Sequence, residues 1–451
     1  MRLPVLRASV LLLAPWLAGT APAQDIAGRV LGRNGPEAGA WVIAETRDLP
    51  TRYAKVVVTN DAGRFDIPDL PDARYQVWVR GYGLADSARV EARPGARLDL
   101  QVQPAASAAQ AAQLYPSMYW YAMIDVPALG AFPGTGPDGN GMPVSMHTQA
   151  QWLDTVKNRC QSCHLFGTRG IREVPAQFMN GTDSRGAWAL RTVAGQAMNV
   201  MAVALGGLGP QSAYDIFSRW TDRIAAGELP SAQPARPAGI ERNVVITMWD
   251  WASPKHYQHD AISTDKRHPT VNANGLIYGS PEESTDLVPT LDPVRNVAST
   301  VRHPFLDPRT PSSSDLPHGV SAYWGDEAIW DGHTSIHNVM FDAFGKVWFT
   351  ARIRPEENPA FCRAGSTHPS AIADPQQSSV RQLSRFDPVT GREVVLAFNS
   401  ANSPQTARVP VAARSQNFTP LAGQCSPMAD APGSFTVTLA PLGFAVCAAK
   451  D

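Results

Sequence analysis

The chain has 451 residues, and its 39 Lys plus Arg against 40 Asp plus Glu leave a net charge of −1, which offers no basis for nucleic-acid binding. A chain of this length exceeds one hydrophobic core and predicts several domains. The 39 Pro, 35 Gly and only 18% charged residues favour exported β-rich modules joined by irregular connections, so we expect a multi-domain, mainly β protein.

Residues 1–23 have the pattern of a secretory signal peptide. Two arginines precede the apolar run 8–17, and Ala21-Pro22-Ala23 has the small-residue pattern of a cleavage site. The pattern predicts a mature chain that starts at Gln24 and is periplasmic or secreted. No later segment reaches the roughly 18 uninterrupted apolar residues that a membrane span requires, so we expect no membrane span.

Residues 24–103 alternate short β-prone runs with turn sequences, and they predict a small all-β sandwich. The turns are Asn34-Gly35-Pro36 and Asp61-Ala62-Gly63, which supply the backbone conformations that tight turns need. The expected strands are 28–30, 41–44, 55–59, 75–79 and 98–102.

The segments GRV, GAWVIAE and TNDAGRFDIPDLPDARYQVWVRGYG, in that order, closely resemble the carboxypeptidase regulatory-like module. The resemblance implies a non-catalytic, transthyretin-like sandwich whose wider relatives include carbohydrate-binding domains. A carbohydrate ligand is implied by that kinship alone. Trp41 and Trp78 are aromatic side chains that could stack on a sugar, although alternating aromatic residues in strands usually belong to the core.

Residues 104–147 predict a linker followed by an irregular arm. Small residues dominate up to position 112. Tyrosines and then glycines follow over 115–143, without the spacing of a phosphate-binding loop. We expect this arm to pack over the domain that follows.

Residues 148–230 change to helical patterns. Trp152 and Val156 lie four residues apart on a helix that leads into Cys160. A long apolar helix is expected over 188–205, interrupted by Gly195, and a last amphipathic helix runs from about 212 to Gly227.

Cys160-Gln161-Ser162-Cys163-His164 has the pattern of a c-type haem attachment site. Each cysteine thiol would add to one haem vinyl group, and His164 would be the proximal iron ligand. A structural disulfide, a redox CxxC pair and half of a zinc site are the alternatives. A zinc site needs a second Cys or His pair at similar spacing, and the other three cysteines form none.

In size and layout the segment resembles a single-haem cytochrome c domain, with specificity only at the motif. The resemblance implies a sixth iron ligand after His164, for which Met201 ranks first and Met198 second, with Met179 as a further candidate. Met198 and Met201 share one helical face. Methionines at helical spacing are often core residues instead, and bis-histidine ligation by His147 is the other option.

Residues 231–323 predict an irregular connecting segment with one clear strand at 243–251. A cluster of polar residues there offers metal-ligand chemistry: His256, His259, Asp260, Asp265 and His268. Its spacing matches no known ligand pattern, and two prolines argue against a supporting helix. We therefore expect histidines on surface loops.

Residues 324–395 predict β hairpins, one turning at 342–345 and one at 387–391. The units IWDGHTSIHNVMFDAFGKVWFTARI and VRQLSRFDPVTGREVVLA resemble blades of streptogramin (virginiamycin B) lyase-like propellers. A closed propeller needs several blades of about 40 residues, and here only one or two fit. The family's catalytic residues lie on later blades, so the resemblance carries none of them to this chain.

Residues 396–451 predict four β runs, at 396–399, 407–411, 435–439 and 444–447. They resemble the end of the C-terminal β-sandwich of secreted alpha-amylase-type glycoside hydrolases, without the catalytic barrel. The resemblance implies a Cys425–Cys447 disulfide, which chain entropy makes worth roughly 3 kcal/mol. Cys362 is then left over as a free thiol.

These patterns together predict an exported mono-haem protein for electron transfer, carrying one covalent haem c and a non-catalytic β-sandwich for binding. The alternative is a carbohydrate- or ligand-binding protein related to streptogramin lyase-like propellers, with no redox role. A glycoside hydrolase is less favoured, since no catalytic barrel precedes the tail. The sequence identifies neither the redox partner nor a sugar, and it favours an electron carrier or binding protein over an enzyme.

Overall fold

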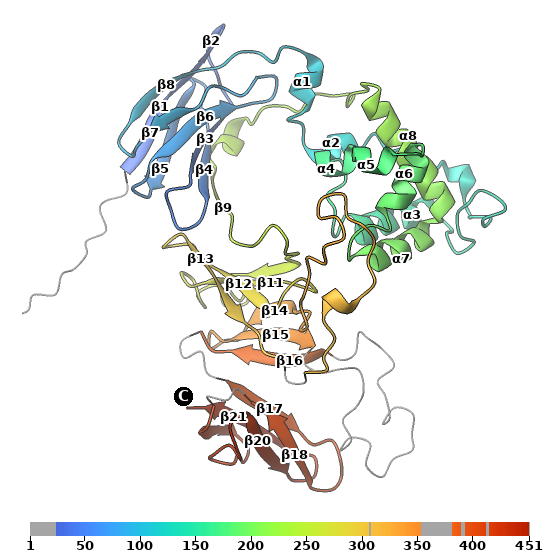
Figure 1. Ribbon diagram of the computed structural model, residues 1–451. Helices are drawn as coiled ribbons and strands as arrows, with labels where there is room; N and C mark the ends of the chain where they lie inside the picture. The colour runs from blue at the N-terminus through green and yellow to red at the C-terminus, as the bar shows by residue number, and fades with distance from the viewer. Residues whose placement is uncertain (1–23, 306–307, 353–380, 389–392, 412–414, 451) are drawn as a thin grey trace, which may run out of the picture. The chain divides into compact units, whose positions relative to one another are not determined.

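A computed structural model describes residues 24–305, 308–352, 381–388, 393–411 and 415–450. The expected signal peptide and Cys362 lie outside these residues. The described chain is mainly β, with several separate sheets and a group of helices (Figure 1). None of its helices combines the length and the apolar character that crossing a bilayer requires. The chain divides into two compact units, the first formed by 24–48, 54–106 and 235–248 and the second by the rest.

The first unit consists of two β-sheets. One has the order β2-β1-β5, with β8 added in parallel to β1, and the other has the order β7-β6-β3-β4-β9. Both sheets contribute fully buried apolar side chains, among them Ile26, Ile67 and Val79. The strands are β1 (Gln24–Gly32), β2 (Gly35–Pro36), β3 (Trp41–Thr46), β4 (Tyr53–Val58), β5 (Arg64–Leu70), β6 (Tyr75–Arg80), β7 (Val90–Ala92), β8 (Arg97–Gln101) and β9 (Val245–Trp249).

All five strands expected here are present, and the structure adds β5 at the place where the sequence pattern is interrupted by Pro68. The strand expected near 243–251 is β9, which pairs with β4 in the first unit although almost 200 residues separate them. Trp78 is buried against Ile43 and Val56, and half-buried Trp41 lies edge-on to Tyr82 with ring centroids 4.8 Å apart. Trp78 is therefore a core residue, as alternating aromatics usually are.

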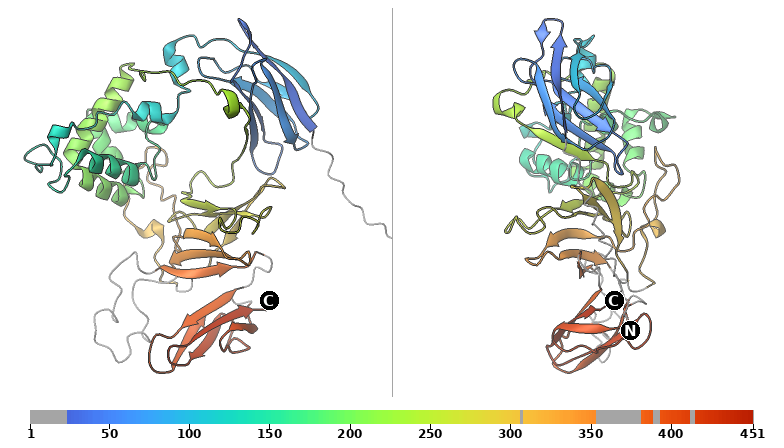
Figure 2. Two further views of the ribbon diagram at one scale, coloured as in Figure 1. Left: turned by 180° about the vertical axis from the view of Figure 1, so that it is seen from behind. Right: turned by 90° about the vertical axis from the view of Figure 1, so that its left-hand side faces the viewer.

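The second unit begins with the helical segment. Its helices α2 to α8 gather in one group, and α1 stands apart from them (Figure 1; Figure 2). They are α1 (Ala108–Ala112), α2 (Ser117–Tyr121), the 3-10 turn η1 (Leu129–Ala131), α3 (Gln149–Thr155), the π-helical turn η2 (Val156–Cys160), α4 (Arg169–Arg172), α5 (Ala176–Met179), α6 (Ser184–Arg191), α7 (Met198–Leu208) and α8 (Pro210–Ala225), followed by the 3-10 turn η3 (Gly239–Arg242) in the first unit.

Local sequence explains where these helices begin and end. The Thr148 side chain accepts from Gln151 N–H to cap α3, and Asp183 caps α6 through Gly186 N–H. The expected single helix over 188–205 is two helices, because Gly195 takes a left-handed φ of +68° between α6 and α7. Gly227, with φ +96°, follows the end of α8 as expected.

One apolar core holds the helices together. Trp152, Phe217 and Trp220 are among its most buried members, and Cys160 packs against it at the end of η2. The arm over 115–143 belongs to this core through Ile124 and Met142, as predicted. The expected linker up to position 112 is helical at its end, because Ser107 caps α1 by accepting from Gln110 N–H.

Two antiparallel sheets follow and share one core. The first has the order β10-β11-β12-β13 and the second the order β14-β15-β16. Tyr278, Val288 and Phe349 are buried where they meet. The strands are β10 (Asp260–Ile262), β11 (Ile277–Ser280), β12 (Leu287–Asp292), β13 (Val297–Arg302), β14 (His337–Phe341), β15 (Val347–Arg352) and β16 (Arg381–Phe386), with a 3-10 turn η4 (Ser313–Asp315) between β13 and β14.

The prediction of an irregular connection over 231–323 is therefore wrong for its second half, where four strands pair. β12 escaped detection because its residues 288–291 are all buried, which removes the alternation of a half-exposed strand, and because Pro289 within it argues against a strand. The hairpin expected at 342–345 is confirmed: Asp342 N–H donates to Lys346 O at 2.9 Å, and Gly345 takes φ +75°.

The second expected hairpin, through 387–391, does not form between β16 and β17 (Val394–Phe398). β16 pairs with β15, whereas β17 pairs with β21 in the C-terminal sheet β17-β21-β19. A second pair, β18-β20, completes this region, and Phe435 and Cys447 are fully buried between the strands. The other strands are β18 (Gln405–Pro410), β19 (Phe418–Ala422), β20 (Ser434–Leu439) and β21 (Phe444–Ala449). Cys425 and Cys447 form a disulfide.

His303 is a buried imidazole on which the second pair of sheets depends. Its Nδ1 lies 2.9 Å from Pro304 O, which can only accept, so Nδ1 carries the proton and Nε2 accepts from the Ser384 hydroxyl. Burial lowers the pKa of His303 to about 4, against an ordinary value of 6.5. The unfolded chain therefore takes up this proton before the folded one does as the pH falls.

We predict that this region is fully stable above pH 6.5 and loses stability as the pH falls toward 4. His303→Gln removes the titration, so the wild type should lose about 1 kcal/mol more per pH unit than the variant between pH 6 and 4.5. Urea unfolding followed by tryptophan fluorescence measures this difference, with half-buried His318→Gln as the control. Parallel pH slopes for wild type and His303→Gln would contradict the prediction.

Candidate haem-attachment site

The Cys160–His164 motif forms a closed turn at the end of a helix. α3 continues into η2, whose wider π turn ends where Gln161 N–H donates to Val156 O at 3.1 Å. His164 N–H then donates to Cys160 O at 2.9 Å, and Cys163 N–H points at the same carbonyl at 3.4 Å. This turn places both cysteines and the histidine within one loop of backbone. The capped helix and its buried Trp152 hold that loop in place.

Both motif cysteines are free thiols, which argues against the structural disulfide. Cys160 is half-buried against the helical core, and Cys163 is exposed. Burial, and then the charge of Cys163, raise the pKa of Cys160 to about 11. A redox CxxC motif instead lowers the pKa of its attacking thiol. The electrostatics of this pair therefore disfavour the redox alternative.

The zinc alternative also lacks support. In the part of the chain that the structure describes, the Cys160 and Cys163 sulfurs and a His164 ring nitrogen do not all lie within 4.8 Å of one another. The two sulfurs and a His164 ring nitrogen are thus too far apart to bind a single ion. Haem attachment makes no such demand, because the sulfurs bond to carbon and only the imidazole meets the iron.

His164 is exposed at its surface, while its inner side lies against groups that favour the neutral imidazole. Burial, and then the positive charge of Arg191, lower its pKa below the ordinary 6.5. Arg191 is itself fixed, because it donates to Ile171 O at 2.9 Å and to Gly170 O, and its guanidinium lies over the Trp188 ring. A neutral imidazole has the lone pair that metal ligation requires.

Apolar side chains lie exposed on the segments around the motif. Leu165 follows it directly, and Leu190 and Val193 flank Arg191. Val200 and Val203 lie on α7, which contacts η2. These side chains are between 47% and 68% exposed, unusually high for leucine and valine in one small region. These side chains lie on the segments around the two free thiols and His164.

The sixth-ligand candidates differ in their surroundings. Met198 and Met201 are half-buried on α7, on the face that also carries the buried Leu205 and Leu208. Neither is among the buried residues of the helical core, although Leu205 and Leu208 on the same face are. Met179 is 40% exposed at the end of α5, and His147 is exposed just before the cap of α3.

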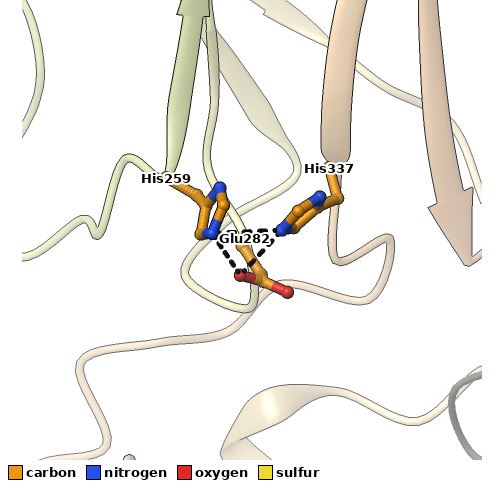
Figure 3. Close-up of side chains that lie close together, drawn as sticks. All are labelled: His259, Glu282 and His337. Carbon is orange, nitrogen blue, oxygen red and sulfur yellow. Dashed lines mark hydrogen bonds and ion pairs between the residues drawn. The ribbon is translucent and has the colours of Figure 1, made fainter. Parts of the chain in front are cut away.

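The polar residues of the histidine-rich segment after β9 do not form a single cluster in the structure. His259 comes together with Glu282 and His337, two residues that the sequence analysis did not single out (Figure 3). Asp260 lies behind them, whereas Asp265 forms a local ion pair with Arg267 and His268 is exposed. Sequence spacing could not reveal this group, because 55 residues separate Glu282 from His337.

Tyr257 connects the motif to this group. Its hydroxyl lies 3.5 Å from Cys163 Sγ, and its ring lies edge-on to His259 with centroids 6.0 Å apart. Burial and the contact with Cys163 raise the pKa of Tyr257, so the phenol stays protonated. The Tyr257 hydroxyl thus contacts the motif, and the Tyr257 ring contacts the group around His259.

The sequence matches no protein-family model and no curated protein.

We predict that Cys160 reacts slowly with iodoacetamide in the haem-free chain. In Cys163→Ser the charge of the second thiol is gone but burial remains, so the pKa of Cys160 should stay above its ordinary value of 9.0. In Cys160→Ser, the exposed Cys163 should be alkylated faster at pH 8. Alkylation rates followed by mass spectrometry across pH 6 to 11 test this, and a Cys160 thiol that titrates near neutral pH would restore the redox alternative.

Proposed function

We propose that the chain is a mono-haem c-type cytochrome-like protein that transfers electrons. The observation that carries the proposal is the closed turn in which free Cys160, free Cys163 and neutral His164 meet beside exposed apolar side chains. A bound haem would supply one-electron oxidation and reduction. The family resemblance of 148–230 to cytochrome c domains supports the same reading.

The roles follow from the chemistry of each group. Cys160 and Cys163 would be the thioether anchors, each thiol adding its sulfur and its hydrogen across one haem vinyl group. His164 is the proximal ligand, and its lowered pKa leaves the ring nitrogen free of a competing proton. Arg191 is a positioning residue that holds a positive charge near the imidazole, which favours the reduced state of a bound metal.

The remaining parts of the chain are proposed as non-catalytic. The first unit is proposed as a transthyretin-like binding or spacer module, the two sheets β10 to β16 as a propeller fragment, and β17 to β21 as an amylase-type tail domain. A periplasmic or secreted location is proposed from residues 1–23, and that oxidising space suits both haem attachment and the Cys425–Cys447 disulfide. The redox partner would dock near the haem edge.

Absorbance spectra test the proposal directly. Chain exported from a host with haem-attachment machinery should carry one haem that resists acid–acetone extraction. Cys160→Ala with Cys163→Ala should lose that resistance entirely, because both covalent anchors are gone, whereas Ser162→Ala should keep it. Wild-type protein without a covalent haem band would refute the proposal.

We predict that Met201 is the sixth ligand. Met201→Ala should abolish the sulfur-to-iron charge-transfer band of the oxidised protein and lower its reduction potential, because a thioether ligand raises that potential. Met198→Ala and Met179→Ala are the matched controls and should keep the band. Loss of the band in Met198→Ala alone would identify Met198 as the ligand in place of Met201. A wild type with no such band would favour His147 as the ligand, and His147→Ala would test that assignment.

A further inference from the structure

His259, Glu282 and His337 lie at the ends of three different strands. His259 directly precedes β10, Glu282 follows β11 and His337 begins β14. Two hydrogen bonds tie the three ends together: His259 N–H donates to Ser280 O at 2.9 Å, and the Ser280 hydroxyl donates to Ile336 O at 2.8 Å. The group therefore rests on a rigid frame, as built ligand sites do.

Three ligand atoms converge at this point. His259 Nε2 and His337 Nε2 lie 3.2 Å apart, and Glu282 Oε2 lies 3.5 Å from His337 Nε2 and 4.0 Å from His259 Nε2 (Figure 3). Two nitrogens bound to a tetrahedral zinc ion at about 2.05 Å would be about 3.3 Å apart. The imidazole pair thus already has the separation that an ion requires, and Glu282 needs only a small side-chain movement.

Asp260 orients the imidazoles from behind. Its Oδ2 lies 3.0 Å from His259 Nδ1, an ion-pair distance that favours a proton on Nδ1 and so leaves Nε2 available as a ligand atom. The same oxygen lies 3.8 Å from His337 Nδ1 and accepts from Asn338 N–H at 3.2 Å. A carboxylate behind a histidine is the usual outer-shell partner of a metal-bound imidazole.

The backbone beside two of the three residues takes a left-handed conformation. Glu283 and Asn338, which follow Glu282 and His337, both have positive φ, at 58° and 52°. Asn adopts this conformation readily, so only Glu283 is held in a conformation that its residue type seldom takes. The Glu283 carboxylate is held by the hydroxyls of Ser313 and Ser335, both at 2.8 Å.

Without an ion, a single proton accounts for the contact between the rings. The two Nε2 atoms are 3.2 Å apart, and with a proton on His259 Nδ1 the donor between them would be His337 Nε2–H. A divalent ion would take the place of that proton between the two rings, and the negative charge of the Glu282 carboxylate would attract it. The side chains of His259, Glu282 and His337 are 32%, 22% and 22% exposed, so an ion would also face solvent and keep an open coordination position.

We propose that His259, Glu282 and His337 bind one divalent first-row transition-metal ion through Nε2, Oε2 and Nε2, with Asp260 fixing the ring orientation. Imidazole nitrogens favour such ions over Mg²⁺ and Ca²⁺. Two histidines and one carboxylate with an open position form a centre suited to metal-assisted chemistry on a bound water or substrate. The proposal stands independently of the haem, which involves other residues.

The test is zinc titration by calorimetry of the full chain after dialysis against a chelator. The background is Cys160→Ala with Cys163→Ala, which removes the competing thiols and makes the result independent of haem. We expect one zinc ion per chain. His259→Gln, His337→Gln and Glu282→Gln should each weaken binding by more than about 100-fold, and Asp260→Asn by about 10- to 100-fold.

His268→Gln is the matched control, because His268 is exposed in the same segment and lies outside the group. It should bind zinc as the background chain does, while Mg²⁺ should give no heat. Circular dichroism of each variant checks that the fold is kept. The proposal is overturned if the background chain binds no stoichiometric zinc, or if His268→Gln weakens binding as much as His337→Gln.

Discussion

The hydrogen bond from His164 N–H to Cys160 O is the constraint on which the candidate haem site depends. It closes a turn that brings two thiols and an imidazole together at the end of α3 and η2. The helix is held by the Thr148 cap and by Trp152 in the helical core, so the turn has a fixed base. Under the proposed function, a large apolar group bound at this turn would cover the exposed apolar side chains around it, which would explain why they are exposed without that group.

Two sets of ligand-type residues meet in the second unit. Tyr257 contacts Cys163 of the motif and lies edge-on to His259 of the proposed metal site. Its pKa is raised by burial and by the neighbouring thiol, and Glu282 and Asp260 act in the same direction. Under the two proposals, a charge placed at either centre would alter the electrostatic field at this one phenol.

Local patterns in the sequence predicted several strands of the first unit and the ends of several helices, but not the four strands β10 to β13. The cap at Thr148, the break at Gly195 and the end at Gly227 are properties of single residues, and all three were predictable. Pairing between distant segments was not: β9 joins β4, and β17 joins β21 instead of β16. β12 was missed because full burial and Pro289 remove the alternation that marks a strand. His337 and Glu282 were missed for the same reason as the pairings, because three strand ends bring them to His259 only in the folded chain.

Intact-mass spectrometry of the exported chain tests the central claim most directly. Protein purified from a host that attaches haem should exceed the mass of the polypeptide by one haem under denaturing conditions, and a peptide spanning Cys160 to His164 should carry that added mass. The same protein from a host without the attachment machinery should have the mass of the polypeptide alone. A chain with no added mass from either host, and with Cys160 and Cys163 still alkylatable, would contradict the account.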